Sequence, residues 1–421
     1  MYSRLLLLFF VALKLYYAHN HSLKLEQVLI LSRHNVRTPL SKNLFEFTPK
    51  VWPTWKEKSG YLTAKGAMLE GFMGEYFALW LRQEGLLTDV CPAESEFYVY
   101  ANNVQRAMVS AESFVNNAFP HCNITIHNAG DSQKDAIFNP VIHNSSRPFK
   151  MEALQEMQAF LNSLHLNSSY KDLEGILDYK DSKYCNLNHK CDLVVDKNKL
   201  FVNTGFKPNL EGPLKISKSV IDSFIMENYE GFDNVAWGTL QDVDQWNAIL
   251  DLSRGYHNVI FNTTLVAHDV AKPLLRFIND LFVHRQNKVT LLMGHDSNIY
   301  TVLKSMGFKP YILDDQYEMI PAGGKLVFQK WVDVSGKFYV KIDYVYQCTD
   351  GMREGRRLSF SNPPEFRTLE LAGCKIDVNG LCLWEDFVNL LSNNSYLIKC
   401  DKWVMHEAIY IYWSDNTLYS F

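Results

Sequence analysis

The sequence VLILSRHNVRTP, residues 28–39, places charge where a buried strand is expected to end. The apolar run is long enough for one buried strand, and two arginines flanking a histidine, Arg33-His34-x-x-Arg37, follow almost at once. Pro39 then ends regular structure, because proline lacks a backbone N–H. Ligands of α/β proteins bind at the carboxyl ends of strands. This stretch therefore predicts a site with two forked cations and one titratable nucleophile.

A second segment supplies another arginine in a similar place. Phe97 to Ala101 is rich in residues that favour strands, and a helical pattern from Val104 to Phe119 follows it. Arg106 is therefore predicted in the first turn of a helix, just past the end of a strand. A cation in the first turn opposes the helix dipole and costs the helix some stability. Arg106 is therefore expected to serve a ligand and not the helix. A solvated surface arginine is the alternative interpretation.

A third segment has the same organisation. Lys288 to Met293 is an apolar strand pattern that ends in GHDSN, residues 294–298. Ser297 is predicted to cap the following helix, which Gly307 is expected to end. A helix N-terminus attracts anions through its unpaired N–H groups. A second buried strand thus delivers His295 and Asp296 to a place suited to an anion.

The composition excludes several classes of protein. With 421 residues, of which 47% are hydrophobic and 14% aromatic, the chain can bury a large core in two domains or one domain with a large insertion. The formal net charge of −4 gives no field that would attract nucleic acid or an anionic membrane. An anion site must therefore come from local clustering of cations.

The character of the sequence changes along the chain. Between Cys122 and Val235, helical patterns and polar loops predict a mainly helical insertion or cap domain. Strand patterns return after it, with the alternation of a β-hairpin within residues 325–347. We therefore expect an α/β domain interrupted by a helical one. The predicted boundaries are 19–121 and 236–391 for the α/β domain, 122–235 for the insertion, and 392–421 for a tail of unclear role.

The N-terminus is typical of a secretory signal peptide, predicted as residues 1–18. Arg4 precedes a short apolar core, Leu5 to Leu13, which is well below the ~20 residues that span a bilayer. No membrane span is expected in the mature chain. Asn-x-Ser/Thr sequons fit a secreted or lumenal protein, in the extracellular space or a lysosome-like compartment. These candidate glycosylation sites are Asn20, Asn123, Asn144, Asn167, Asn262 and Asn393.

Eight cysteines in a chain that enters an oxidising compartment indicate disulfides. Three candidate pairs lie close in the sequence or bracket one strand–helix unit: Cys185 and Cys191, Cys374 and Cys382, and Cys91 and Cys122. Cys348 and Cys400 either pair with each other or stay reduced, and the sequence alone leaves the connectivity open. A metal site is the competing interpretation, but the chain contains no Cys-x-x-Cys pair.

The three strand-end segments together supply the groups that hydrolyse a phosphate monoester. That reaction needs a nucleophile for phosphorus, cations for the non-bridging oxygens and an acid for the leaving alcohol. His34 is the candidate nucleophile, and three guanidiniums can donate forked hydrogen bonds at roughly 1.5–3 kcal/mol per charge-assisted bond. Asp296 is the candidate acid, which requires that partial burial raise the pKa of its carboxyl group.

These motifs resemble those of the histidine acid phosphatases, the branch of the histidine phosphatase superfamily that includes phytases and secreted acid phosphatases. RHNVRTP at 33–39 with the distant His295-Asp296 carries the resemblance. Between about residues 25 and 390, further segments are similar to the glucose-1-phosphatase and phytase group in particular. They are NVQR at 103–106, YEGF at 229–232, VAWG at 235–238, GHDSN at 294–298 and GGKLVF at 323–328.

The resemblance implies a fold and a role for each matching residue. The implied fold is α/β, with a phosphoglycerate-mutase-like central sheet flanked by helices and a second, mainly helical domain inserted. No metal or other cofactor is implied. The implied roles are phosphoacceptor for His34, proton donor for Asp296, and phosphate binding for Arg33, Arg37, Arg106 and His295.

Two departures from the sugar-phosphatase pattern bear on the substrate. That pattern has an acidic residue directly after the Trp-Gly pair, where this chain has Thr239, so Thr239 is a candidate for specificity. Before the Gly-Gly pair, Met319-Ile320-Pro321 replaces Arg-Thr-Pro.

The sequence therefore predicts a secreted acid phosphatase that hydrolyses small phosphate monoesters through a covalent phosphohistidine, with sugar phosphates such as glucose 1-phosphate favoured. A phytase acting on inositol polyphosphates is the alternative within the family. A non-catalytic secreted binding protein on the same fold is an alternative of another class, and intact His34 and Asp296 count against it. A mutase or transferase that passes the phosphoryl group to another acceptor is a third class. The expected partner is a small-molecule substrate, and no oligomeric state is predicted.

Overall fold

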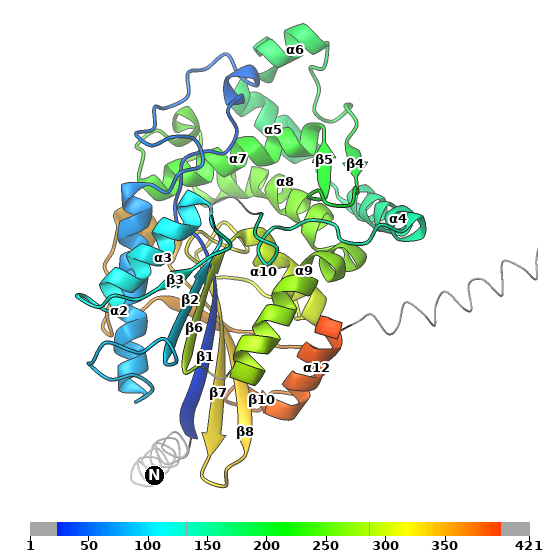
Figure 1. Cartoon of the computed structure of the whole chain (residues 1–421). Coiled ribbons are helices and arrows are strands. Elements are labelled where there is room, and N and C mark those ends of the chain that lie inside the picture. The colour runs from blue at the N-terminus through cyan, green and yellow to red at the C-terminus, as the bar shows by residue number, and fades with distance from the viewer. Residues whose placement is uncertain (1–22, 131–133, 286, 397–421) are drawn as a thin grey trace, which may run out of the picture.

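The computed structural model describes residues 23–130, 134–285 and 287–396. The predicted signal peptide, residues 397–421 of the predicted tail, Asn20 and Cys400 therefore lie outside the described residues. A mixed β-sheet forms the centre, helices cover both of its faces, and further helices gather at one end (Figure 1). The predicted α/β class, with a central sheet flanked by helices, is confirmed.

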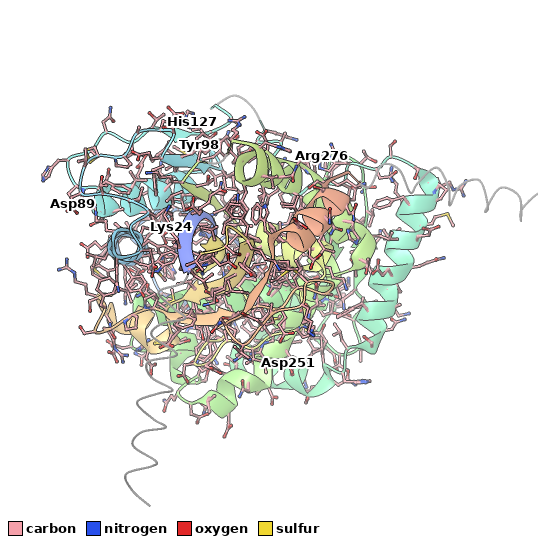
Figure 2. The ribbon with its side chains drawn as sticks, turned by 90° about the horizontal axis from the view of Figure 1, so that it is seen from below. Lys24, Asp89, Tyr98, His127, Asp251 and Arg276 are labelled. Atoms are coloured by element: carbon pink, nitrogen blue, oxygen red, sulfur yellow. A yellow bond between two sulfur atoms is a disulfide. The ribbon has the colours of Figure 1, made fainter. Side chains whose placement is uncertain are left out.

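The strands form one large sheet and one small one. Their bounds are β1 Leu23–Arg33, β2 Phe97–Ala101, β3 Ile126–His127, β4 Lys199–Phe201, β5 Asn209–Glu211, β6 Val289–Gly294, β7 Lys325–Asp333, β8 Phe338–Tyr346, β9 Glu365–Thr368 and β10 Leu381–Leu383. The large sheet has the order β10-β8-β7-β1-β6-β2-β3, with β9 beside β8, and β4 pairs with β5. Neighbours among β1, β6, β2 and β3 pair in parallel. At this edge the rings of Tyr98 and His127 stack with 4.9 Å between centroids (Figure 2).

The helices include the predicted ones that follow β2 and β6. Their bounds are α2 Ala64–Gln83, α3 Gln105–Ala118, α4 Arg147–Ser163, α5 Asn167–Leu177, α6 Lys183–Asn188, α7 Pro213–Glu230, α8 Val243–Phe261, α9 Thr264–Asn279, α10 Asp296–Met306, α11 Thr349–Glu354 and α12 Trp384–Tyr396. Short 3₁₀ turns occupy Leu44–Glu46, Tyr179–Asp181 and Val235–Gly238, and a π-helical turn occupies Asp280–Arg285.

β1 lies at the centre of the sheet, which explains its continuous apolar run. Val28 and Ile30 belong to the core shared with α2 and α3, whereas Leu29 and Leu31 belong to the core shared with α9, α10 and α12. All four side chains are fully buried. Because both faces of the strand are covered, its sequence does not alternate.

The helix cap predicted at Ser297 is wrong, whereas a threonine caps α2. Thr63 caps α2, and its hydroxyl accepts a hydrogen bond from the N–H of Gly66 at 2.9 Å. Ser297 does not cap α10, because the helix begins one residue before it. His295 holds the cap position in an extended conformation, and its N–H donates to the side-chain oxygen of Asn298 at 2.9 Å.

α4, α5, α7 and α8 pack together beyond the carboxyl ends of the parallel strands (Figure 1). α8 continues this helical layer past residue 235, and the predicted domain boundaries stay predictions. Within the described ranges, none of the helices combines the length and apolarity that crossing a bilayer requires.

Disulfides join the three candidate cysteine pairs: Cys91 to Cys122, Cys185 to Cys191 and Cys374 to Cys382. Cys348 is half-buried and forms no disulfide with another described residue. Among the candidate glycosylation sites, Asn123, Asn167 and Asn393 are exposed and Asn144 and Asn262 are half-buried. Their glycosylation stays a prediction.

Candidate active site

The carboxyl ends of β1, β6 and β2 meet at one edge of the sheet. Arg33, the last residue of β1, is level with Gly294, the last residue of β6. Backbone hydrogen bonds continue past the strand ends, from His34 N–H to the oxygen of Gly294 and from Asn102 N–H to the oxygen of Met293, each at 2.9 Å. Strand register therefore brings the predicted arginine–histidine loop, His-Asp pair and α3 together.

The ring of His34 is buried and has one nitrogen fixed by a hydrogen bond. Nδ1 lies 2.8 Å from the carbonyl oxygen of Asn35, and because a carbonyl only accepts, Nδ1 carries the proton. Nε2 therefore keeps its lone pair. Burial, followed by the charges of Arg106 and His295, lowers the pKa of His34 well below its usual value. The ring is thus neutral, with its one proton on Nδ1, and able to act as a nucleophile in mildly acidic solution.

A fully buried ion pair lies beneath this loop, between Glu70 of α2 and Lys325 of β7. Lys325 Nζ is 2.6 Å from Glu70 Oε1 and donates to Ser32 Oγ at 2.9 Å. The other carboxylate oxygen of Glu70 accepts from the side-chain amide of Asn35 at 2.9 Å. This network, which we call the loop cluster (Glu70, Lys325, Ser32 and Asn35), holds the residue whose carbonyl fixes the tautomer of His34.

Arg37 is buried and makes a forked pair with a carboxylate that the sequence did not point to. Its two terminal nitrogens lie 3.0 and 2.8 Å from the oxygens of Asp222 on α7. Lys218, one turn earlier on α7, is 3.5 Å from the same carboxylate. Burial alone would raise the pKa of Asp222, but Arg37 and Lys218 outweigh it and lower the pKa. We call Arg37, Asp222 and Lys218 the cap cluster.

Arg33 and Arg106 complete the set of three arginines. Arg33 Nη1 is 2.9 Å from Glu318 Oε1. Burial and then the charge of Arg37 lower the pKa of Arg106 to about 10. Within the described residues, the Nε atoms of Arg33, Arg37 and Arg106 are all buried without a hydrogen-bond partner. Buried donors of this kind are suited to the oxygens of an anion.

His295 lies beside His34, with 5.3 Å between the two ring centroids. Its Nε2 is 3.0 Å from the side-chain oxygen of Asn102. The amide nitrogen of Asn102 donates to the carboxylate of Asp135 at 3.2 Å, which fixes the amide and makes Nε2 of His295 the donor. Nδ1 is therefore the nitrogen available to a ligand, and it can donate when the ring is protonated.

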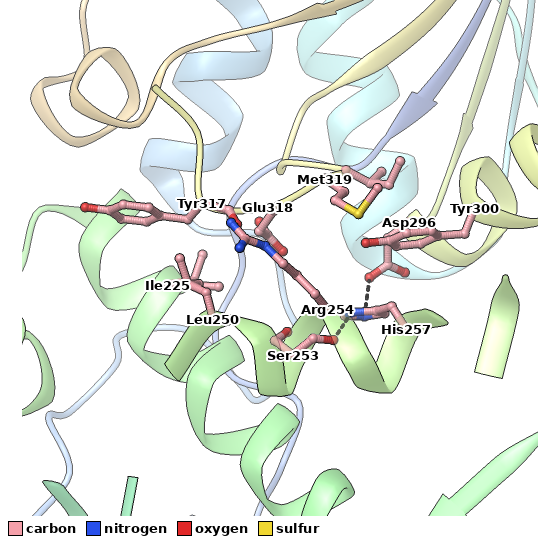
Figure 3. Close-up of a pocket in the computed structure, with 11 residues that line it drawn as sticks. Ile225, Leu250, Ser253, Arg254, His257, Asp296, Tyr300, Tyr317, Glu318 and Met319 are labelled. Atoms are coloured by element: carbon pink, nitrogen blue, oxygen red, sulfur yellow. Dashed lines mark hydrogen bonds and ion pairs between the residues drawn. The ribbon is translucent and has the colours of Figure 1, made fainter. Parts of the chain in front are cut away.

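The pKa of Asp296 is shifted in the opposite direction from the sequence prediction. Burial acts to raise the pKa of Asp296, as expected, but His257, Arg33 and Lys218 outweigh burial and hold the pKa well below its usual value. His257 Nε2 is 3.6 Å from Asp296 Oδ2 (Figure 3). Arg33 Nη2 is 4.0 Å from the same oxygen. The expectation was wrong because the sequence did not indicate that the helical region adds cations around this carboxylate.

One further cation comes from the segment before β5. Lys207 is exposed by surface area, and desolvation by the neighbouring protein atoms lowers its pKa to about 8. The charges of Asp296, Lys218 and Arg106 act on it, which places it at the same site. Its Nζ lies 4.9 Å from the centre of the Phe261 ring.

Thr239, the specificity candidate, follows the 3₁₀ turn Val235–Gly238. Its hydroxyl donates to the oxygen of Ala236 at 2.6 Å, within its own turn. Trp237 of that turn packs on Trp52, with 4.9 Å between ring centroids. The six residues predicted from the motifs thus meet at one place, whereas the contacts of Thr239 are made with its own turn.

Sequence reasoning missed Asp222, Lys218, Lys207, His257 and Glu318. Helical patterns were predicted in the region of α7, and the i, i+4 spacing of Lys218 and Asp222 on that helix was the available signal. Periodicity alone does not indicate whether such a pair faces solvent or a site, because that depends on the packing of α7 and α8.

Comparisons with known proteins agree on one family. Residues 24–345 match the model of the histidine phosphatase superfamily (branch 2). The chain is 42% identical over 380 residues to a glucose-1-phosphatase of Providencia rettgeri, covering 87% of this chain and 91% of that protein. It is 28% identical over 400 residues to a phytase of Escherichia coli, covering 88% of this chain and 92% of that protein. The apo structure of Hafnia alvei phytase aligns with a TM-score of 0.82 at 30% identity, covering 89% of this chain and 97% of that chain.

Proposed function

Because this chain belongs to branch 2 of the histidine phosphatase superfamily and is a phosphoric monoester hydrolase, we propose that it acts through a phosphohistidine on His34. The observation that carries the proposal is the hydrogen bond from Nδ1 of His34 to Asn35, which leaves Nε2 with its lone pair. That nitrogen belongs to a site with three arginines whose Nε donors are unpaired in the described residues.

In the first step, Nε2 of His34 attacks phosphorus while the arginines and His295 hold the non-bridging oxygens. The bond between phosphorus and the alcohol oxygen breaks, and its electron pair stays on that oxygen. Asp296 gives its proton to the oxygen, so that a neutral alcohol leaves and a carboxylate is formed.

In the second step, a water molecule attacks the phosphorus of the phosphohistidine. Asp296 takes a proton from this water, the bond between nitrogen and phosphorus breaks, and its electron pair returns to Nε2 of His34. Phosphate leaves, and the protein regains its neutral histidine and the proton that it gave to the alcohol. The two steps balance without a further reactant.

The lowered pKa of Asp296 is compatible with this role once substrate charge is counted. Arg33 and Lys218 are among the cations that lower the pKa. A phosphate dianion held between the arginines offsets their charge and raises the pKa of a neighbouring carboxyl group. Binding of substrate therefore favours the protonated form of Asp296 at the time it is needed.

The charges around the site favour a substrate with one phosphate group. Five cations (Arg33, Arg37, Arg106, Lys207 and Lys218) lie near three carboxylates (Asp222, Glu318 and Asp296), which leaves two positive charges, or three when Asp296 holds a proton. One phosphate dianion matches that charge to within one unit, whereas an inositol polyphosphate exceeds it. We therefore favour sugar phosphates such as glucose 1-phosphate, in line with the name of the relative from Providencia rettgeri.

We also propose that the mature protein is secreted or lumenal. Three disulfides among the described residues support an oxidising compartment.

The intermediate is tested by acid quench after mixing with a phosphate monoester carrying labelled phosphorus. We expect acid-labile label on His34, and we expect His34→Ala to lose both the label and essentially all turnover of a chromogenic aryl phosphate. His268→Ala, at a half-buried histidine of α9, is the matched control and should keep wild-type labelling. Label on serine or aspartate would sink the phosphohistidine proposal.

The substrate class is tested by comparing kcat/KM for glucose 1-phosphate with kcat/KM for phytate under the same mildly acidic conditions. We expect glucose 1-phosphate to be preferred by at least about tenfold, which is ~1.4 kcal/mol of discrimination. A preference for phytate would assign the inositol polyphosphate alternative instead.

A further inference from the structure

His257 of α8 presents one ring nitrogen to the carboxylate of Asp296. The distance from Nε2 to Oδ2 is 3.6 Å, and the residue is 7% exposed. Its other nitrogen, Nδ1, is 2.9 Å from the carbonyl oxygen of Ser253. Because that oxygen only accepts, Nδ1 carries a proton whatever the charge of the ring. Any second proton on the imidazole must therefore sit on Nε2, between the ring and Asp296.

The orientation of this ring is fixed from two sides. It stacks on Tyr300 with 5.2 Å between centroids and planes 10° apart, and it meets Tyr256 edge-on at 5.6 Å. Tyr300 lies on α10, one turn after Asp296, so the same helix positions the carboxylate and one face of the imidazole (Figure 3). The contact between His257 and Asp296 is thus built into the packing of α8 on α10.

The charged groups around the pair allow it to hold one proton. Arg33 of β1 and Lys218 of α7 are cations that act on Asp296, and Arg254 of α8 lines the same cavity as His257. Glu318, on the segment before β7, is already paired with Arg33 at 2.9 Å. We call His257 and Asp296 the couple. The neighbouring cations disfavour binding of a second proton to the couple, whereas the negative charge of the carboxylate favours binding of a first proton.

A small cavity lies beside the couple. Ser253, Arg254, Tyr300 and Glu318 contribute to its walls together with the couple itself (Figure 3). About 10 Å³ is available to the centre of a water molecule, which is room for about one. A water molecule at this place would lie directly beside His257 and Asp296.

We infer that His257 is a positioning residue that shares a single proton with Asp296 and thereby sets the pH range in which Asp296 can act as an acid. The inference rests on the proposed phosphatase mechanism. Before substrate binds, the proton resides on Nε2 of His257, and the dianion shifts it to Oδ2 of Asp296. The couple holds no proton after the alcohol leaves and regains one from the attacking water, so that each turnover closes.

The first test is the pH dependence of kcat/KM, which reports the ionisations of the free enzyme, for His257→Gln, which keeps a polar side chain but cannot hold the proton. On glucose 1-phosphate, we expect the basic limb of the profile to move to lower pH by about one unit or more, because the carboxyl group must then hold the proton alone. On p-nitrophenyl phosphate the shift should be much smaller, because an activated phenolate leaves without an acid. His268→Gln is the matched control and should shift neither limb.

Equal losses on both substrates with unmoved limbs would assign His257 a packing role and overturn the inference. If the same variant still turns over p-nitrophenyl phosphate and still carries acid-labile label on His34, the proposed phosphatase mechanism stands even though the inference about His257 fails. Absence of that turnover in the wild type would instead remove the proposed function.

The second test does not depend on activity or on a stable His257 variant. The proton on Nε2 of His257 is observed by ¹⁵N NMR of labelled histidine in the wild type and in Asp296→Asn at the same mildly acidic pH. We expect the Nε2 signal to show a bound proton in the wild type and to lose it in Asp296→Asn, since the carboxylate favours the imidazolium. The same Nε2 signal in both proteins would show that the two groups do not share a proton.

Discussion

Two buried clusters of opposite charges lie near His34, and they differ in which hydrogen-bond donors they leave unpaired. In the loop cluster, Lys325 Nζ has partners in Glu70, Ser32 and the carbonyl of Gly323, and the ion pair is fully buried. In the cap cluster, Asp222 occupies both terminal nitrogens of Arg37, but Nε of Arg37 has no partner among the described residues. The first cluster is closed, and the second can still accept an anion.

The comparison shows that buried ion pairs serve two purposes in the same site. A closed ion pair adds no binding capacity, and its value lies in fixing the loop that holds His34. An open pair keeps an arginine oriented while leaving a donor for phosphate, and its carboxylate tempers the positive field. Changes in the loop cluster should therefore affect stability first, whereas changes in the cap cluster should affect affinity first.

Lys325→Met should give the largest effect, because it leaves Glu70 as a buried and unpaired carboxylate. Removing one partner of a buried ion pair costs roughly 3–5 kcal/mol. We expect a loss of that size in the free energy of unfolding, measured by urea denaturation with the disulfides intact. Since Glu70 also holds Asn35, kcat should fall even at temperatures where the variant is folded.

The double variant Glu70→Gln/Lys325→Met is the matched control for this prediction. It removes both charges, while the glutamine oxygen can still accept from Asn35. We expect it to recover most of the lost stability. If the single variant unfolds at the same urea concentration as the wild type, the loop cluster does not stabilise the site.

Asp222→Asn tests the cap cluster and should change ligand affinity. The asparagine oxygen still accepts from Arg37, but a negative charge beside the phosphate site is lost. We expect inorganic phosphate to inhibit at about tenfold lower concentration, or ~1.4 kcal/mol. Because the pKa of Asp222 is lowered, its carboxylate is ionised throughout the mildly acidic range, and the difference should persist there.

Asp251→Asn on α8 is the control for that substitution, because Asp251 is exposed and pairs with Arg254 at 3.1 Å. It should leave the inhibition constant of phosphate within about twofold of the wild type. Weaker phosphate binding by Asp222→Asn would mean that orientation of Arg37 outweighs the repulsion, and the two clusters would then work alike.

The division between strand-end residues and helical residues also explains what the sequence could predict. Arg33, His34, His295 and Asp296 follow apolar runs, so the register of parallel strands brings them together. That information is local, and it gave the α/β class, the central sheet and six candidate residues.

The helical side of the site depends on contacts between distant segments. Asp222 and Arg37 are 185 residues apart in the chain, and their meeting depends on how α7 packs above the sheet. The same packing supplies His257, which reverses the expected direction of the Asp296 pKa shift. Amphipathic periodicity predicts that a helix is buried but not which of its polar residues meets a given strand end.

Lys207→Met should give the smallest effect, and it tests a charge that belongs to neither the loop cluster nor the cap cluster. Its ammonium contributes to the field of the site, and such a contribution acts on bound substrate and transition state alike. We expect KM to rise about threefold with kcat unchanged, and the effect to shrink as salt is added. The pKa of Lys207 is about 8, so the KM of the wild type should approach that of the variant as the pH rises through that value and the ammonium loses its proton.

Lys199→Met is the matched control, since Lys199 also lies over an aromatic ring, 5.1 Å from the centre of Phe201. A change in kcat for Lys207→Met would place its ammonium among the groups that act in the transition state.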